Sequence, residues 1–226
     1  MKANVPTRKK IKLEWFKSKC EINIERKIEL EYTSSNILLN EIKWNTVVKY
    51  MLTKEGESID IPSKSPMTFY KNGLPFLFLS TANNIGNKII SEALIDEDIV
   101  INDDIVQIKE GKAEITFEDA IDPKEQIEVR TRYDAITRKI NVENKLDTEI
   151  EVIIVFKQTK EVTFVKADPK PSEIEEPNYK FKIAIPSGQS KKTALDLQGK
   201  IVSRVTKIRP EFLRPIEKSS KFNKIQ

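Results

Sequence analysis

The side chains best placed for chemistry form two short acidic groups on either side of an apolar run. Residues 96–98 read Asp-Glu-Asp and residues 102–104 read Asn-Asp-Asp. Oxygen ligands of this kind suit calcium, and paired carboxylates also carry out glycoside hydrolysis. The order of an EF-hand loop is missing and no glycine lies within the segment, so solvated strand ends are the favoured interpretation. The weak calcium candidates are Asp96, Asp98, Asp103 and Asp104.

The absence of histidine excludes more chemistry than any residue present in the chain. Without histidine there is no Ser-His-Asp or Cys-His nucleophile and no His-ligated metal site. Cys20 is the single cysteine, which excludes thiolate clusters and an intrachain disulfide, and the six glycines form no phosphate-binding loop. Carboxylate or lysine chemistry remains open. We predict that the protein is not an enzyme and that it uses no cofactor or resident metal.

The charge balance does not indicate a nucleic-acid partner. The 226 residues carry 39 basic and 35 acidic side chains, a net charge of +4. A lysine strip near the N-terminus contains Trp15 and Phe16, but Glu14 interrupts it, so we interpret it as a solvated arm. Its lysines are Lys9, Lys10, Lys12, Lys17 and Lys19. Charged residues make up 33% of the chain, and lysine, glutamate and isoleucine are conspicuous, which fits a thermophile protein or the bias of a low-GC genome.

Two further sets of side chains are candidates for binding. Trp15, Phe16 and Trp44 could stack on a carbohydrate, although a tryptophan in a β-rich protein more often fills the core. Four basic residues alternate along one expected hairpin and would line an exposed face, useful for solubility or for an acidic partner. They are Arg130, Arg132, Arg138 and Lys139.

The sequence carries no sign of a membrane span or of a signal peptide. No stretch approaches the roughly 18 apolar residues of a spanning helix. The N-terminus has positive charges but no apolar segment after them. We therefore expect a protein of the cytoplasm or of an assembled particle.

Alternation of apolar and polar residues with a period of two dominates the chain. Residues 20–32, CEINIERKIELEY, place Ile22, Ile24 and Ile28 on one face, as one long strand or two short ones. Such runs recur roughly every 8–12 residues with turn signals between them, which predicts an all-β fold of antiparallel β-sandwich type with little helix. The best helix candidate is residues 87–98, which could also be an irregular crossing.

A domain boundary is expected near residues 119–125, a polar segment that contains Pro123 and separates two groups of strands. One continuous sandwich with long insertions is the alternative. The predicted organisation is a basic N-terminal arm (1–12), an N-terminal sandwich-like half (13–120), an immunoglobulin-like C-terminal half (125–208) and a C-terminal tail (209–226).

A family resemblance rests on the C-terminal half. It reads YDAITRKINVENKLDTEIEVIIVFKQ, then a proline-rich acidic loop, then NYKFKIAIPSGQSKKTALDL. A strand carrying ENK and a later IPSGxSKK turn flank a variable loop. In this respect residues 130–198 resemble the C-terminal β-sandwich domain of the mucoidy-inhibitor-like family of uncharacterised proteins. The resemblance implies a fold and no catalytic residues.

One apolar run stands out in this highly charged chain, LPFLFL at residues 74–79. Pro75 suits a strand start or an edge, because proline cannot donate a ladder hydrogen bond. Both faces of such a strand are apolar, so both require cover, either from the rest of the chain, which we favour, or from another subunit. The predicted interface residues are Leu74, Phe76, Phe78 and Leu79.

These patterns predict a non-enzymatic structural or interaction protein, a β-sandwich subunit of a larger assembly. A virion or cell-surface component of archaeal or viral origin would fit, with other proteins or further copies of the chain as partners. The alternatives are a ligand-binding module for glycan or calcium and, ranked below it, a carboxylate-based glycosidase.

Overall fold

The computed structural model describes residues 20–54, 61–85 and 87–212. These residues form fifteen strands and one short 3₁₀ helix, η1 (Pro210–Phe212). The prediction of an all-β, mainly antiparallel sandwich is confirmed. Within the described ranges one strand pair is parallel, β1 with β11, and all other strand pairs are antiparallel.

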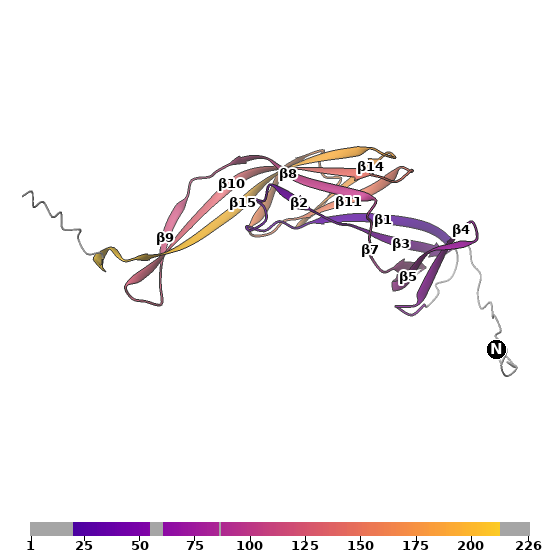
Figure 1. The fold of residues 1–226 in the computed structure, drawn as a ribbon, viewed down its shortest axis with the longest axis horizontal. Helices are drawn as coiled ribbons and strands as arrows, with labels where there is room; N and C mark the ends of the chain where they lie inside the picture. The colour runs from indigo at the N-terminus through magenta and orange to yellow at the C-terminus, as the bar shows by residue number, and fades with distance from the viewer. Residues whose placement is uncertain (1–19, 55–60, 86, 213–226) are drawn as a thin grey trace, which may run out of the picture.

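The first sheet has nine strands and runs the length of the sandwich (Figure 1). Its hydrogen-bonded order is β13-β14-β11-β1-β3-β6-β5-β4, with β7 paired to β3. The bounds are β1 Cys20–Leu30, β3 Thr46–Lys54, β4 Pro66–Lys71, β5 Leu74–Ile85, β6 Lys88–Ser91, β7 Leu94–Ile95, β11 Ile150–Lys157, β13 Glu173–Glu175 and β14 Asn178–Ile185. The alternation at residues 20–32 thus forms one strand, β1, which ends at Leu30, and Tyr32 lies in the loop that follows.

The second sheet has six strands in the order β12-β15-β10-β8-β2, with β9 paired to β10. The bounds are β2 Glu41–Lys43, β8 Ile99–Lys109, β9 Glu114–Asp119, β10 Glu125–Asn144, β12 Val162–Asp168 and β15 Ser190–Ile208. Strands β10 and β15 pair without a register shift from Glu143 and Ser190 to Glu125 and Ile208. This ladder is the longest strand pairing among the described residues.

The core lies between the two sheets, and its residues come from positions as far apart in the sequence as Ile28 and Leu197. Every second residue of β10, such as Ile136, Ile140 and Val142, is buried against the first sheet, as strand alternation requires. Phe156 of β11 is fully buried and contacts three further aromatic rings. Those rings belong to Tyr32, Phe164 and Tyr179.

The expected division into two sandwich-like halves does not describe this packing. Strand β1 pairs with β11 in one sheet, and β8 pairs with β10 in the other, so residues before and after position 125 share one core. Residues 119–125 instead form the turn between β9 and β10. Here Asp122 accepts hydrogen bonds from the backbone of Lys124 and Glu125. A polar segment with a proline serves a turn as well as a linker.

The helix candidate at residues 87–98 is also wrong, because this segment forms β6 and β7. Ile89 and Ile90 lie opposite Leu52 and Met51 of β3. β-Branched side chains fit this pleated surface better than a helix.

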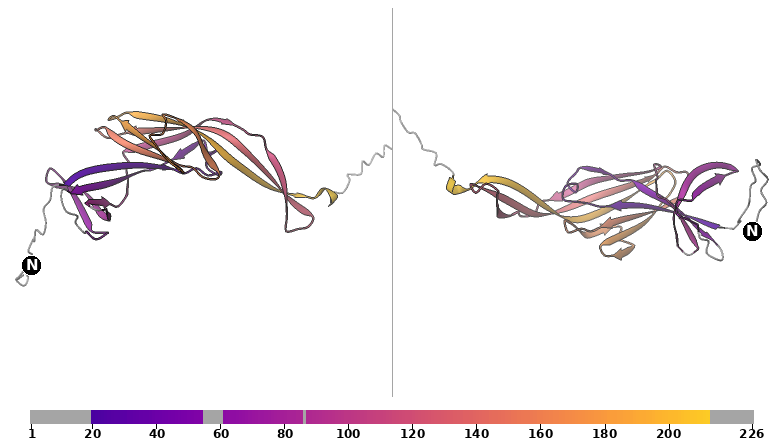
Figure 2. Two further views of the ribbon diagram at one scale, coloured as in Figure 1. Left: turned by 180° about the vertical axis from the view of Figure 1, so that it is seen from behind. Right: turned by 90° about the horizontal axis from the view of Figure 1, so that it is seen from below.

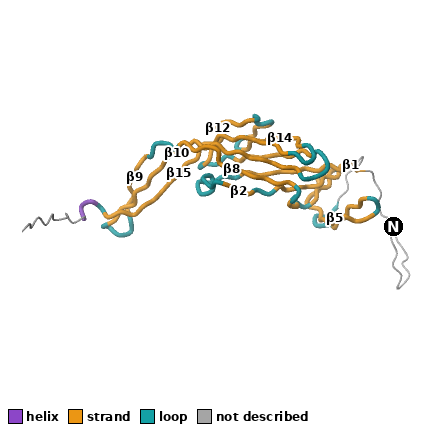
Figure 3. The backbone as a smooth tube through the Cα atoms, turned by 45° about the horizontal axis from the view of Figure 1, so that its top comes forward, coloured by secondary structure: helices purple, strands orange, loops and turns teal. Residues whose placement is uncertain are grey.

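The molecule is elongated, with a different structure at each end (Figures 1 and 2). At one end β9 and the adjoining ends of β10 and β15 extend beyond the sandwich as a three-stranded sheet, called the arm below (residues 114–133 and 200–208). At the other end lies the β4–β5 hairpin. The loops lie mainly at the ends of the sandwich and at the arm tip (Figure 3).

Candidate protein-interaction surfaces

The β4–β5 hairpin covers part of the first sheet that the second sheet does not reach. Register pairing places Ile22, Leu52 and Ile89 in one row, on the face that carries the core residues of β1. The ring of Phe69 on β4 packs against Tyr50 on β3, with 5.0 Å between the ring centroids. The hairpin therefore continues the sandwich with a second, smaller apolar layer.

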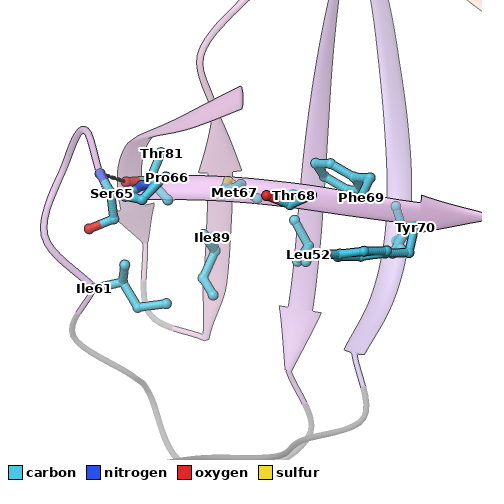
Figure 4. A pocket seen from close by; sticks show the side chains of 11 residues that line it. Leu52, Ile61, Ser65, Pro66, Met67, Thr68, Phe69, Tyr70, Thr81 and Ile89 are labelled. Carbon is cyan, nitrogen blue, oxygen red and sulfur yellow. Dashed lines mark hydrogen bonds between the residues drawn. The ribbon is translucent and has the colours of Figure 1, made fainter. Parts of the chain in front are cut away.

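An apolar cavity of about 400 Å³ lies under this hairpin (Figure 4). The hydroxyl of Thr81 donates to the Pro62 carbonyl and accepts from the Ser65 backbone N–H, which closes one end of the cavity. Its lining contains no carboxylate, lysine or cysteine among the described residues, so it offers shape and apolar surface. The lining residues are Ile22, Leu52, Ile61, Ser65, Pro66, Met67, Thr68, Phe69, Tyr70, Thr81 and Ile89.

The hairpin carries several exposed apolar side chains. The run at residues 74–79 does begin a strand, β5, as predicted. The expectation that the chain covers both of its faces is wrong within the described residues, because exposed apolar side chains lie on both faces of the hairpin. Tyr70 and Phe78 share one face, and the register shift between Phe69 and Tyr70 places Leu74 on the other. The exposed fractions are 64% for Tyr70, 72% for Leu74, 55% for Phe76 and 70% for Phe78. Three of the four predicted interface residues are thus accessible, and Leu79 is half-buried.

The arm is a second exposed apolar surface. Ile115, Phe117 and Val205 lie on one of its faces and Val202 and Ile208 on the other, and all five are exposed. In the described part of the chain no element packs on either face of the arm. Thin sheets of this kind gain stability when a further layer or strand is added.

Ion pairs hold the strands of the arm together. The carboxylate of Glu128 in β10 is buried and accepts hydrogen bonds from Lys207 in β15 and from Arg130. These two bonds, that of Lys207 first, lower the pKa of Glu128 below its ordinary value. Arg209 reaches Asp119 of β9 and the backbone carbonyl of Glu125. These contacts connect all three strands of the arm.

The four weak calcium candidates do not converge. Asp96 accepts a hydrogen bond of 2.8 Å from Arg26, and Asp98 is exposed. Asp103 and Asp104 are adjacent in β8, so their side chains point to opposite faces, one buried and one exposed. Among the described residues no group of three or more acidic or cysteine side chains could hold a metal ion.

Asp103 belongs instead to a fully buried charge network. Arg138 donates from Nε to Asp103 Oδ1 at 2.8 Å, and Tyr32 and Trp44 both donate to Oδ2 at 2.7 Å. The remaining guanidinium nitrogens donate to the carbonyls of Ile37, Leu39 and Asp103. Every charge in this cluster is thus compensated, which is the condition for burying ions in a protein core.

The network fastens the segment between β1 and β2 to the second sheet. Burial raises the pKa of the Tyr32 hydroxyl well above its ordinary value, and the nearby Asp103 raises it further. The hydroxyl therefore remains a donor at any physiological pH. The guanidinium of Arg138 also lies over the Tyr32 ring, 5.4 Å from its centroid. The geometry is that of a structural cluster, because Arg138, Asp103 and Tyr32 are all enclosed.

This network was not predicted, although the sequence contains a sign of it: a charged residue at a core position in each of two strands. Arg138 occupies the same alternation parity as Ile136 and Ile140, and Asp103 the same parity as Ile99 and Ile101. A charged residue at a core position requires a partner of opposite charge. The expectation that Arg138 lies on an exposed face was therefore wrong, whereas Lys139 is exposed.

The remaining candidates do not form an open binding site in the described ranges. Trp44 is half-buried and bonded to Asp103, so it is not a free stacking platform. Arg130 and Arg132 form ion pairs with neighbouring carboxylates. Trp15, Phe16 and the N-terminal lysine strip lie outside the described residues.

A search of the described residues finds no helix long and apolar enough to cross a membrane. No protein-family model matches the chain, and no curated protein or solved structure is significantly similar to it. The resemblance of residues 130–198 to the mucoidy-inhibitor-like family therefore stays a prediction, and any function has to be argued from the two exposed surfaces.

Proposed function

We propose that the protein is a non-enzymatic structural subunit whose exposed apolar surfaces pack against other protein chains. The observation that carries this proposal is the β4–β5 hairpin, where the exposed side chains Tyr70, Leu74, Phe76 and Phe78 lie on two adjacent strands. Large exposed apolar surfaces of soluble proteins commonly mark sites of protein interaction.

Burying the exposed apolar side chains of the hairpin in an interface would be energetically favourable. Fully burying one large apolar side chain contributes about 1.5–3 kcal/mol, so four side chains that are half to three-quarters exposed offer several kcal/mol to an interface. The enclosed Arg138–Asp103 pair and the aromatic core stabilise the sandwich independently of this surface. The hairpin surface is therefore free to serve binding. An assembled particle, such as a virion or a cell-surface structure, is the setting we propose.

Replacing Phe78 by aspartate tests the hairpin directly. The side chain points outward, so Phe78→Asp is expected to leave folding intact while a desolvated charge prevents docking. Light scattering of the purified protein should show a lower native mass for the variant than for the unmodified chain, with an unchanged far-UV circular dichroism spectrum.

Ile174→Asp provides the matched control. Ile174 lies on β13, on the body of the sandwich, and it is exposed to a similar degree. This variant should keep the native mass of the unmodified protein. Equal masses for Phe78→Asp, Ile174→Asp and the unmodified chain would remove the hairpin from any contact between copies of this chain.

A further inference from the structure

The outer edge of β15 is partly unoccupied. Strand β12 covers this edge only as far as Lys200, whose backbone N–H donates to the Glu161 carbonyl at 2.7 Å. Residues 201–208 continue into the arm with no neighbouring strand on that side among the described residues. Pro210, which has no N–H, ends the usable edge. The open stretch is therefore eight residues long and closed at both ends.

Hydrogen bonds at both ends show which backbone groups point outward. The N–H of Lys200 points toward β12, whereas the N–H of Arg209 points inward and donates to the Lys124 carbonyl at 2.8 Å. Backbone groups in a strand alternate between its two sides. The residues whose N–H and C=O groups both point outward are therefore Val202, Arg204, Thr206 and Ile208.

We propose that this edge pairs antiparallel with the same edge of a second copy of the chain, with Val205 opposite Val205 of the second copy. This pairing rests on the proposed function, and it specifies the partner as a second copy of the chain and the contact as the edge of β15. The two arms would form a continuous six-stranded sheet, with the order β9-β10-β15 followed by its two-fold mate. Such an isologous contact is the commonest symmetry of homo-oligomers.

The register follows from the positions of charge and proline. A pairing centred on Arg204 would place two guanidinium groups directly opposite each other, which is unfavourable. A pairing centred on Thr206 would place Val202 opposite Pro210, which cannot donate. Centring on Val205 pairs Val202 with Ile208 and Arg204 with Thr206, so all four outward-facing residues of each copy find partners. The second copy's strand then ends where β12 begins.

Side-chain chemistry agrees with this register. Val202 and Ile208 are exposed on one face of the arm, and Val205 is exposed on the other. In the pairing each of them would meet an apolar side chain of the second copy. Ser203 would lie opposite Lys207, and Arg204 keeps its own ion pair with Glu118 at 3.6 Å. No like charges lie directly opposite one another.

Cysteine cross-linking tests the pairing and its register together. In a Cys20→Ser background, Val205→Cys would place two thiols at a non-hydrogen-bonded pair, where Cα atoms are about 4.5 Å apart, within disulfide range. We expect oxidation of the full-length protein to give a species of twice 26.1 kDa on a non-reducing gel.

Ser203→Cys in the same background is the control, because it lies on the same face of the same strand. Its two thiols would be offset by four residues, about 13 Å, and should not link. The Ser203→Cys/Lys207→Cys double variant should link again. Equal linking at positions 203 and 205, or stronger linking at Arg204→Cys or Thr206→Cys, would overturn the proposed pairing.

The same cross-linking in a Phe78→Asp background separates the two proposals. If the arm pairs as described, the Val205→Cys dimer forms whether or not the hairpin is disabled. A missing Val205→Cys dimer, with Phe78→Asp still lowering the native mass of the unmodified chain, overturns the arm pairing and leaves the proposed function standing. A persistent dimer without any effect of Phe78→Asp on native mass supports the pairing and removes the hairpin from the assembly.

Discussion

Replacing Asp103 by alanine is expected to lower the free energy of unfolding by about 3–5 kcal/mol. Asp103 is fully buried and accepts hydrogen bonds from Arg138, Tyr32 and Trp44. Its removal leaves the guanidinium of Arg138 buried without a counter-charge, and this desolvation penalty dominates the loss. Equilibrium unfolding in urea, followed by tryptophan fluorescence and by circular dichroism, measures the change.

Neighbouring variants show whether the buried charge is the cause. Asp104→Ala changes the adjacent, exposed residue and should alter stability by at most about 0.5 kcal/mol. Tyr32→Phe removes one hydrogen bond to the Asp103 carboxylate and should lower the free energy of unfolding by about 1.5–3 kcal/mol. The Asp103→Ala/Arg138→Met double variant should lose less than the two single losses combined, because neither charge is then left alone. If Asp103→Ala lowered the free energy of unfolding no more than Asp104→Ala does, the stabilising role of the buried Arg138–Asp103 network would be contradicted.

Phe156→Ala, as a separate single variant, is expected to lower the free energy of unfolding by about 3–5 kcal/mol. The side chain is fully buried, and its ring contacts Tyr32, Phe164 and Tyr179 with centroid distances of 6.0 Å. Tyr179 belongs to the first sheet, Phe164 to the second, and Tyr32 to the loop after β1, so the cavity left by the substitution opens the contact between the layers. The thermal midpoint and the urea midpoint should both fall, and the slope of the urea transition should stay constant.

Phe117→Ala serves as the comparison, because this ring lies exposed on the arm. Its loss should have little effect on the stability of the sandwich. The two positions therefore distinguish a core aromatic residue from a surface one. A cost at Phe156 as small as that at Phe117 would mean that the two sheets do not pack as described.

The strands of the sandwich were readable from the sequence because their chemistry is local. Alternation correctly indicated strands at β1 and β10. It located their buried faces less well, because Ile22 and Ile24 are exposed and Arg138 is buried. The same alternation contained the Arg138–Asp103 pair, since each residue interrupts a row of buried apolar positions. The pair can be predicted if each charged residue at a core position is taken to require a buried partner of opposite charge.

The features that were missed depend on which segments meet in space. Nothing in the residues of β1 specifies that it pairs in parallel with β11, more than a hundred positions later. The polar segment with Pro123 suits a linker and a hairpin turn equally, so the tip of the arm resembled a domain boundary. An apolar run such as residues 74–79 indicates a strand, but its composition does not say whether the second layer comes from the same chain.

The native mass of the purified, unmodified protein, measured by light scattering across a dilution series, tests the central claim most directly. The account predicts a species of at least twice 26.1 kDa that dissociates on dilution. A mass of 26.1 kDa at every concentration would show that neither the hairpin surface nor the open edge of β15 joins copies of this chain. The proposal of self-assembly through these surfaces would then be contradicted.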